Sequence, residues 1–343
     1  MMMKEWNSMK TRYTKSWRLP TQLHKGMTIA VVSGHTMSST ERLHITLLWQ
    51  ALGYQLIWAS SSVQTSTRVS QEVVMDELNH YMTSADCDAV MVSQDDTIGI
   101  KALARLDYER IRYYHKPCIG ANLCTMFHRA LHQESRLITY HGLSLAEQGR
   151  CTVEEAHMIR ERLDQPHVEQ VYVSDAAISM WQLVALVEGK SKVIEPLPEP
   201  PRGMIGTELG MGRLLGGSLS SLCALQDTPY RLRDDEATAT ILWVHTEKSE
   251  VKLLSQRIKE LQKTDVLGWV QGIAVSGSIG CDDIGFDLLR CMEESRRSSK
   301  GDPFVCYLPT NREGRCIPLP LGATVNFRYI SNTLLYEPYC KRQ

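Results

Sequence analysis

Several features that would assign the chain to a membrane, metal-binding or disulfide-rich class are missing from its sequence. No run of about 18 apolar residues is present, so we expect no membrane-spanning helix. Ten cysteines are spread from Cys87 to Cys340 without a Cys-x-x-Cys pair, which indicates neither a zinc-ligand spacing nor a disulfide framework. The start of the chain lacks the apolar core of a signal peptide. We expect a cytoplasmic protein without a metal or another cofactor.

The sequence also has no excess of charge of either sign. Its 38 Lys and Arg residues balance 39 Asp and Glu residues, so no global field favours nucleic acid or a membrane surface. Any anion site must be local. The one biased segment is residues 1–20, with five Lys or Arg against one Glu. We expect a flexible basic arm there, and docking to a partner or a transit peptide are the alternatives.

The order of the predicted elements indicates two α/β domains, for which 343 residues are enough. From Met27 onward, apolar runs typical of buried parallel strands alternate with segments of helical spacing, the first capped by Ser39 or Thr40. Such alternation predicts an open parallel sheet with a ligand crevice at the carboxyl ends of its strands. The expected strands are residues 27–33, 54–60, 87–93 and 116–120, and the expected helices are residues 39–53, 70–83, 98–106 and 123–133.

The N-terminal α/β domain is expected to span residues 21–190 and to end with an amphipathic helix over 175–189. Residues 191–203 are rich in proline and predict a linker. Residues 204–343 predict a smaller domain of mixed α/β structure. Its expected strands are residues 238–246, 270–277, 304–309 and 323–327, and its expected helices are residues 250–262 and 286–297.

The segment HKPCIGANLCTMFH, residues 115–128, predicts a strand that turns sharply into a helix. Many hydrolases place a nucleophile at the tip of such an elbow, but here the tip is Asn122. An amide side chain has no comparable nucleophile at neutral pH. Asn does tolerate a left-handed backbone, which a tight elbow often requires. We therefore expect the elbow to persist without a reactive group.

Ordered landmarks along the chain carry a resemblance to one peptidase family. They are KGMTIAVVS, LDYERIRYYHKPCIG, TYHG, GRLLGGSLSSLCALQDTPY, ILWVHTE and CIPLPLGATVNF. On these segments the chain resembles the serine LD-carboxypeptidases and the microcin C self-immunity peptidases, from about Pro20 to about Phe327. The resemblance implies a two-domain fold, a Ser-Glu-His triad and a tendency to form dimers.

Each triad position that the resemblance implies holds a different residue in this sequence. The serine position is Asn122, within Gly-Ala-Asn-Leu. The glutamate position, at the end of ILWVH, is His245. The histidine position, in EGRCIPLPLG, is Arg315, and no histidine follows His245 to replace it. The glycine-rich turn that supplies an oxyanion donor in the family corresponds to Ser93, Gln94, Asp95 and Asp96.

These substitutions predict loss of the family's hydrolytic mechanism. Arg315 stays protonated and cannot act as a general base. Removal of a triad nucleophile alone lowers turnover on the order of 10⁶-fold. We interpret the chain as a catalytically inactive homologue that binds a peptide-like or aminoacyl ligand, or that pairs with an active relative, as a homodimer or a heterodimer. The candidate ligand-binding residues are Arg315, His245, Asn122, Asp95 and Ser93, because Arg binds carboxylates and phosphates bidentately.

Other interpretations of the chain and of these positions stay open. The triad positions can have drifted at an abandoned site. The chain can be a peptidase, an amidase or a recruited biosynthetic enzyme with relocated residues, or a structural subunit. A second serine or cysteine within bonding distance of a histidine in the crevice would contradict the inactive interpretation and favour an enzyme. Cys124 is a weak candidate nucleophile, since we expect it to be a small buried side chain one turn into the helix.

Three further patterns have ordinary structural explanations. His128 and His132 have a spacing that can hold zinc, but Arg129 stands where a metalloprotease has Glu, and we expect surface histidines. The pairs Asp95–Asp96 and Asp282–Asp283 are expected to be solvated loop residues or caps. LLGGSLSSL resembles a phosphate cradle but lacks Lys, and we expect its glycines to serve packing.

Overall fold

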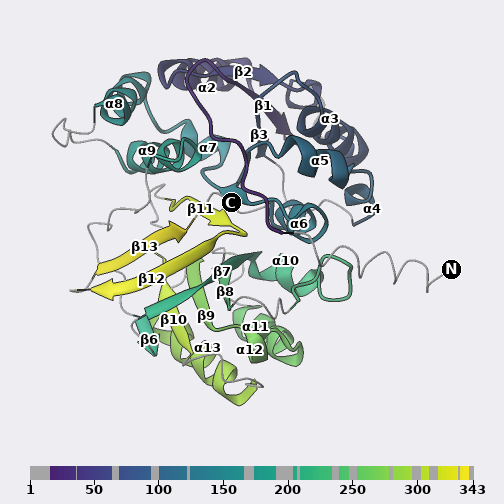
Figure 1. The fold of residues 1–343 in the computed structure, drawn as a ribbon, viewed down its shortest axis with the longest axis vertical. Coiled ribbons are helices and arrows are strands. Elements are labelled where there is room, and N and C mark those ends of the chain that lie inside the picture. The colour runs from purple at the N-terminus through teal and green to yellow at the C-terminus, as the bar shows by residue number, and fades with distance from the viewer. Residues whose placement is uncertain are drawn as a thin grey trace.

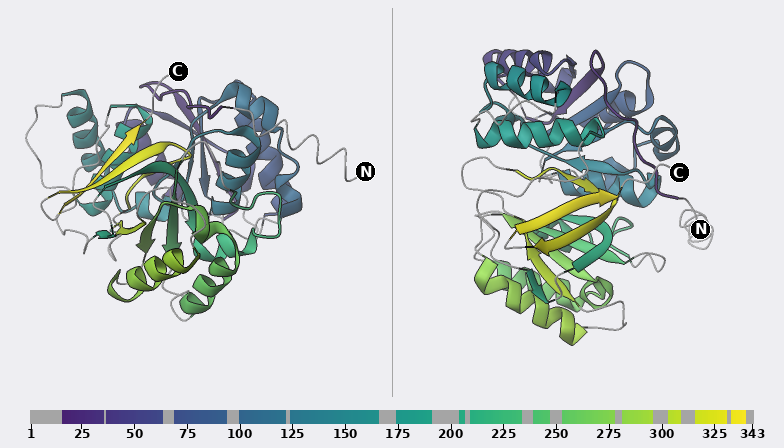
Figure 2. Two further views of the ribbon diagram at one scale, coloured as in Figure 1. Left: turned by 60° about the horizontal axis from the view of Figure 1, so that its bottom comes forward. Right: turned by 60° about the vertical axis from the view of Figure 1, so that its left-hand side comes forward.

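Two mixed β-sheets organise the chain in its computed structural model (Figure 1). The first sheet has the strand order β11-β5-β4-β3-β1-β2, and the second has the order β13-β12-β7-β8-β9-β10-β6. The predicted α/β class and the two-domain architecture are confirmed, and the right-hand view of Figure 2 shows the domains stacked one above the other. The structure describes residues 16–35, 37–63, 69–93, 100–121, 124–165, 174–190, 204–206, 209–233, 239–246, 253–277, 281–295, 303–308, 316–330 and 333–339.

The first sheet is parallel from β1 to β5, as the alternating pattern predicts. Successive residues of β1 point to opposite faces, so that Ile29 and Val31 join one core cluster while Ala30 and Val32 join another. Burial on both faces explains why the strand reads as a continuous apolar run. The strands of this sheet are β1 (Thr28–Ser33), β2 (Gln55–Trp58), β3 (Ala89–Ser93), β4 (Cys118–Gly120), β5 (Thr139–His141) and β11 (Leu319–Leu321).

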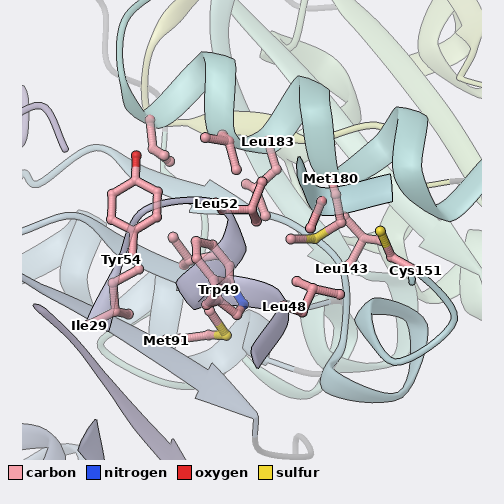
Figure 3. Packing of buried hydrophobic residues seen from close by; sticks show 14 of the residues in the cluster. Ile29, Leu48, Trp49, Leu52, Tyr54, Met91, Leu143, Cys151, Met180 and Leu183 are labelled. Carbon is pink, nitrogen blue, oxygen red and sulfur yellow. The ribbon is translucent and has the colours of Figure 1, made fainter. Parts of the chain in front are cut away.

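Helices cover both faces of the first sheet. The cluster on the Ile29 side includes Trp49 and Met180, and Figure 3 shows the packing of its side chains. The first helix is capped by Ser38, whose hydroxyl accepts from the Glu41 N–H, so the predicted caps one and two residues later are wrong. The segments of this domain are α2 (Ser39–Ala51), η1 (Ser60–Ser62), α3 (Gln71–Thr83), α4 (Ile100–Leu103), α5 (Tyr108–Tyr114), α6 (Thr125–Ala130), η3 (Leu131–Ser135), α7 (Leu145–Gln148), α8 (Val153–Asp164) and α9 (Asp175–Val187).

The second sheet has a parallel centre formed by β7, β8, β9 and β10, with antiparallel strands on both sides. Its strands are β6 (Met204–Gly206), β7 (Leu209–Ser218), β8 (Thr240–Thr246), β9 (Gly272–Gly277), β10 (Phe304–Tyr307), β12 (Thr324–Ile330) and β13 (Thr333–Tyr339). Its helices are α10 (Leu219–Ala224), α11 (Leu254–Lys263), α12 (Val266–Trp269) and α13 (Cys281–Ser295).

The C-terminal half of the chain returns to the first sheet at β11. This strand pairs antiparallel with β5, with Leu319 opposite His141. The two sheets therefore do not follow the predicted division into residues 21–190 and 204–343 strictly, since one strand crosses it. The predicted linker, residues 191–203, lies outside the described residues.

The described part of the predicted arm packs against the fold. Arg18 forms a β-bridge with Leu137, and its N–H donates to the Arg136 carbonyl at 2.7 Å. Residues 16–20 are thus held in place, while residues 1–15 lie outside the described residues. In the part of the chain that the structure describes, no helix is both long enough and apolar enough to cross a membrane.

Candidate functional site

The predicted elbow lies between β4 and α6. β4 ends at Gly120, and the Cys124 N–H donates to the Ala121 carbonyl at 3.0 Å where the helix begins. Asn122 at the tip lies outside the described residues. Cys124 itself is completely buried, with its sulfur 3.6 Å from the Val92 carbonyl oxygen. This placement agrees with a small core side chain rather than a nucleophile.

Two buried imidazoles lie beneath the elbow strand. The Thr139 hydroxyl lies 2.8 Å from His128 Nδ1 and 2.9 Å from His132 Nε2. On its other edge, His128 faces Gly120, where a Cβ atom would be only 2.7 Å from Nε2. Gly120 is therefore required for the imidazole to reach the end of β4.

The prediction that His128 and His132 are surface residues is wrong, since both are at most 2% exposed. Burial lowers the pKa of His128 to about 4 and lowers that of His132 well below its usual value. Both are neutral at physiological pH and serve as hydrogen-bonding groups. Within the described residues, no group of three or more His, Cys, Asp or Glu side chains could hold a metal ion.

His245, the predicted equivalent of the family's glutamate, is buried at the end of β8. His245 Nδ1 lies 3.0 Å from the Ser276 hydroxyl oxygen, and the Trp243 indole N–H donates to the same oxygen at 2.8 Å. His245 and Ser276 are register partners on parallel β8 and β9, which explains how they meet. The imidazole at this position cannot supply a carboxylate. A serine beside a histidine would also favour an enzyme, but the Ser276 hydroxyl is buried and already accepts a hydrogen bond from Trp243.

A thiol in the described segment that follows Arg315 lies close to an imidazole. Cys316 Sγ is 3.4 Å from His141 Nε2, and the Cys316 N–H donates to the Ser179 hydroxyl at 3.0 Å. Arg315, the predicted equivalent of the histidine, lies outside the described residues. The sequence interpretation missed this pair, although both residues lie in quoted landmarks, TYHG and CIPLPLG. A thiol beside a histidine is the arrangement that would favour an enzyme.

Burial determines the protonation of this pair. It raises the pKa of the Cys316 thiol well above its ordinary value and lowers the pKa of His141 well below its own. The proton therefore stays on sulfur, and the thiolate that acts as a nucleophile is disfavoured. Cys316 and His141 are close enough to share a hydrogen bond, but burial keeps both groups neutral.

The carboxyl edges of the two sheets meet around these residues. The His141 and Trp243 rings lie 4.5 Å apart between centroids, at an angle of 42°. The Ser218 N–H at the end of β7 donates to the Thr125 hydroxyl at the start of α6, at 2.8 Å. Arg129 extends the contact by donating to the Arg231 carbonyl at 3.1 Å. The elbow helix is therefore one of the elements that contact both domains beside the site.

The glycines of LLGGSLSSL have a packing role at this junction. A Cβ atom on Gly216 would lie 1.9 Å from the Trp243 carbonyl oxygen, and one on Gly217 would lie 2.3 Å from the Thr125 side chain. Of the other predicted ligand-binding residues, Ser93 ends β3 at the same edge of the first sheet as Gly120. Asp95 and Asp96 lie outside the described residues.

Two family profiles match the chain in the order of its domains. Residues 28–142 match the LD-carboxypeptidase N-terminal domain, and residues 211–327 match the LD-carboxypeptidase C-terminal domain. The chain belongs to the LD-carboxypeptidase family. Its match to both halves of the family agrees with the resemblance expected from the sequence landmarks.

Individual members of this family are distant from the chain but align over nearly its whole length. A Bacillus subtilis (strain 168) protein named "Probable murein peptide carboxypeptidase" is 21% identical over 325 residues, covering 93% of this chain and 94% of its own. The MccF-like protein from Bacillus anthracis str. Ames has a TM-score of 0.69 at 17% identity, covering 93% and 99%. The microcin C7 self immunity protein MccF in complex with aspartyl sulfamoyl adenosine has a TM-score of 0.67 at 15% identity, covering 94% and 98%.

Proposed function

We propose that this LD-carboxypeptidase homologue binds an anionic peptide-like or aminoacyl ligand where the two sheet edges meet, and that it does not hydrolyse the ligand by the family's serine mechanism. The observation that carries the proposal is the imidazole of His245 at the glutamate position, held by Ser276. A buried imidazole can donate or accept a hydrogen bond but brings no negative charge to orient a catalytic base. With Asn122 at the elbow and Arg315 at the base position, all three triad roles are unfilled.

The chemistry of the substituted residues indicates the ligand class. Guanidinium at position 315 would pair with a carboxylate or phosphate through two parallel hydrogen bonds. Two similar proteins have names that fit such a ligand, since one is called a murein peptide carboxypeptidase and another is in complex with an aspartyl sulfamoyl nucleoside. A peptide ends in a carboxylate, and an aspartyl group carries one. Pairing with a serine-bearing relative is a compatible role, because a ligand-holding subunit need not cut.

One observation favours a second function, a thiol-dependent peptidase or amidase. Cys316 Sγ lies within 3.4 Å of His141 Nε2, so His141 could accept the thiol proton as the sulfur attacks a carbonyl carbon. Two observations argue against thiol catalysis: Cys316 and His141 are both buried, and the pKa of the Cys316 thiol is raised. We therefore rank binding first and keep thiol catalysis as the alternative.

Calorimetric titration with an LD-tetrapeptide and with an aspartyl sulfamoyl nucleoside tests the binding proposal. We expect saturable binding in the wild type and at least about a tenfold loss of affinity in Arg315→Ala, because a bidentate charged pair is removed. Arg105→Ala is the matched control, since Arg105 pairs with Asp76 on the surface at 2.7 Å. Equal affinity in the wild type and Arg315→Ala would contradict the proposed site.

Product analysis of the same mixtures tests the second function. Binding without turnover supports the proposal. Turnover that disappears in Cys316→Ala but persists in Cys124→Ala would establish the thiol enzyme instead. Co-purification with a serine-bearing family member, with turnover restored only in the mixture, would assign the partner role.

A further inference from the structure

Trp17 lies between the two domains and touches both. Its ring has the Arg136 guanidinium at 5.3 Å and the Arg213 guanidinium at 4.6 Å, each measured to the ring centroid. Arg136 follows η3 in the first domain, and Arg213 lies on β7 in the second. Guanidinium groups at these distances are attracted to the electron-rich face of an indole. One side chain thus links a cation from each domain.

On the first-domain side, the backbone around Trp17 is fixed. The Arg18 N–H donates to the Arg136 carbonyl at 2.7 Å, and the Ile138 N–H donates to the Arg18 carbonyl at 2.9 Å. Farther along, the Leu23 N–H donates to the Val187 carbonyl at 3.0 Å, at the end of α9. Figure 1 shows this segment as the dark trace that passes beside α6 and continues to the first sheet. The segment therefore moves with the first domain.

On the second-domain side, the indole packs against the core cluster that contains Leu215 and Leu219. It also covers Gly322, where a Cβ atom would lie 2.4 Å from the ring. Arg213 is held by its own hydrogen bond to the Gly322 carbonyl at 2.6 Å. The surface that receives Trp17 is thus shaped for a flat ring, with a glycine at its floor.

The indole also reaches the residues beneath the elbow. The Trp17 and His132 rings lie 5.5 Å apart between centroids. His132 bonds the Thr139 hydroxyl, which in turn bonds His128, and His128 packs on Gly120. A continuous row of buried side chains therefore connects the N-terminal segment to the end of the elbow strand.

We propose that Trp17 is a positioning residue, an interdomain clasp that holds the carboxyl edges of the two sheets at their working separation. The clasp acts through contact with both domains and needs no ligand. Its loss leaves each domain folded but weakens the bonds that cross between them. The Ser218 amide, which donates to Thr125 across the junction at 2.8 Å, reports directly on this separation.

The test is hydrogen exchange at the Ser218 amide, resolved by fragmentation, in ligand-free protein. In Trp17→Ala we expect exchange about tenfold faster than in the wild type, because the Arg213 cation–π contact and the indole packing across the junction are lost. Trp181→Ala is the matched control: Arg162 lies 4.0 Å over the Trp181 ring, and both residues belong to the first domain. We expect this control to lower the melting temperature without changing exchange at Ser218.

Phenylalanine variants, which keep an aromatic ring, give a second comparison if Trp17→Ala does not fold. Trp17→Phe is expected to accelerate Ser218 exchange more than Trp181→Phe does. Unchanged exchange in the Trp17 variants, or equal acceleration in the Trp181 variants, would overturn the clasp and leave Trp17 as ordinary packing. Because no ligand is present, this result is independent of whether the proposed binding function is correct.

Discussion

The rings of His141 in the first sheet and Trp243 in the second are in tilted contact across the domain boundary, with centroids 4.5 Å apart. Each residue also serves a polar pair, His141 with Cys316 and Trp243 with Ser276. The two rings therefore lie between Cys316, which follows the predicted histidine equivalent Arg315 in the sequence, and Ser276, which bonds the predicted glutamate equivalent His245. These side chains form a densely bonded junction, and its properties can be tested residue by residue.

Thr125→Val is expected to destabilise the protein by about 1 to 2 kcal/mol, because it leaves the buried Ser218 N–H without its acceptor. Urea unfolding monitored by circular dichroism measures the change. Thr125→Ser keeps the hydroxyl and should lose clearly less stability. A valine variant as stable as the serine variant would mean that the hydrogen bond across the domains contributes nothing.

Stability is expected to fall as the pH falls from about 6.5 toward 4. Burial lowers the pKa of His128 from 6.5 to about 4, so the unfolded chain binds a proton in this window that the folded chain does not. The free energy of unfolding therefore falls by about 1.4 kcal/mol for each pH unit below 6.5 and for each such histidine, and this contribution is fully retained above pH 6.5. Melting temperatures across this range measure the slope. His128→Gln should flatten the slope, whereas a change at the exposed His157 should not.

Cys316 is expected to resist alkylation in the folded protein. Its pKa is raised by burial, so iodoacetamide at neutral pH should modify the more exposed Cys223 at least about a hundredfold faster. Mass spectrometry of peptic fragments after timed labelling gives both rates in one sample. Faster modification of Cys316 than of Cys223 would instead identify an activated thiol and support the second function.

Gly120→Ala is expected to destabilise the protein by about 1 to 3 kcal/mol, since the added carbon would lie 2.7 Å from His128 Nε2. Gly149→Ala makes the same chemical change where the nearest atom is 3.5 Å away, and it should be close to neutral. Denaturant midpoints compare the two. Equal destabilisation by the two substitutions would show that the His128 ring shifts to accommodate the added carbon and that its contact with Gly120 does not stabilise the elbow.

The first sheet could be predicted because its strands are uninterrupted apolar runs between well-marked helices. β7 escaped prediction as a strand because it contains Gly210, Gly212, Gly216 and Gly217, and glycine is depleted in strands. The structure gives these glycines a steric reason, since a Cβ atom on Gly210 would lie 2.2 Å from the Phe304 ring. Likewise β11 has only three residues, and its partner β5 lies far away in the sequence. Neither the close contact of a glycine with a neighbouring side chain nor pairing with a strand far away in the sequence produces a periodic pattern of apolar residues.

Some residues of the candidate site could be placed from the sequence and others could not, because burial depends on contacts with distant segments. The end of β8 was located correctly because an apolar strand leads to His245. Burial of His128 and His132 could not be inferred from a helix rich in polar residues, because it depends on Thr139 and on the covering N-terminal segment. The sequence roles of Asn122, Arg315 and Asp95 remain predictions.

The edge position of β11 carries a consequence for synthesis of the chain. A growing polypeptide cannot complete its first sheet until residue 321 has left the ribosome, long after the parallel strands have been made. Nascent chains released early would expose the outer edge of β5 to pairing with neighbours. The first sheet is thus completed only after most of the C-terminal half has been made, and a shortened gene product would be prone to aggregate.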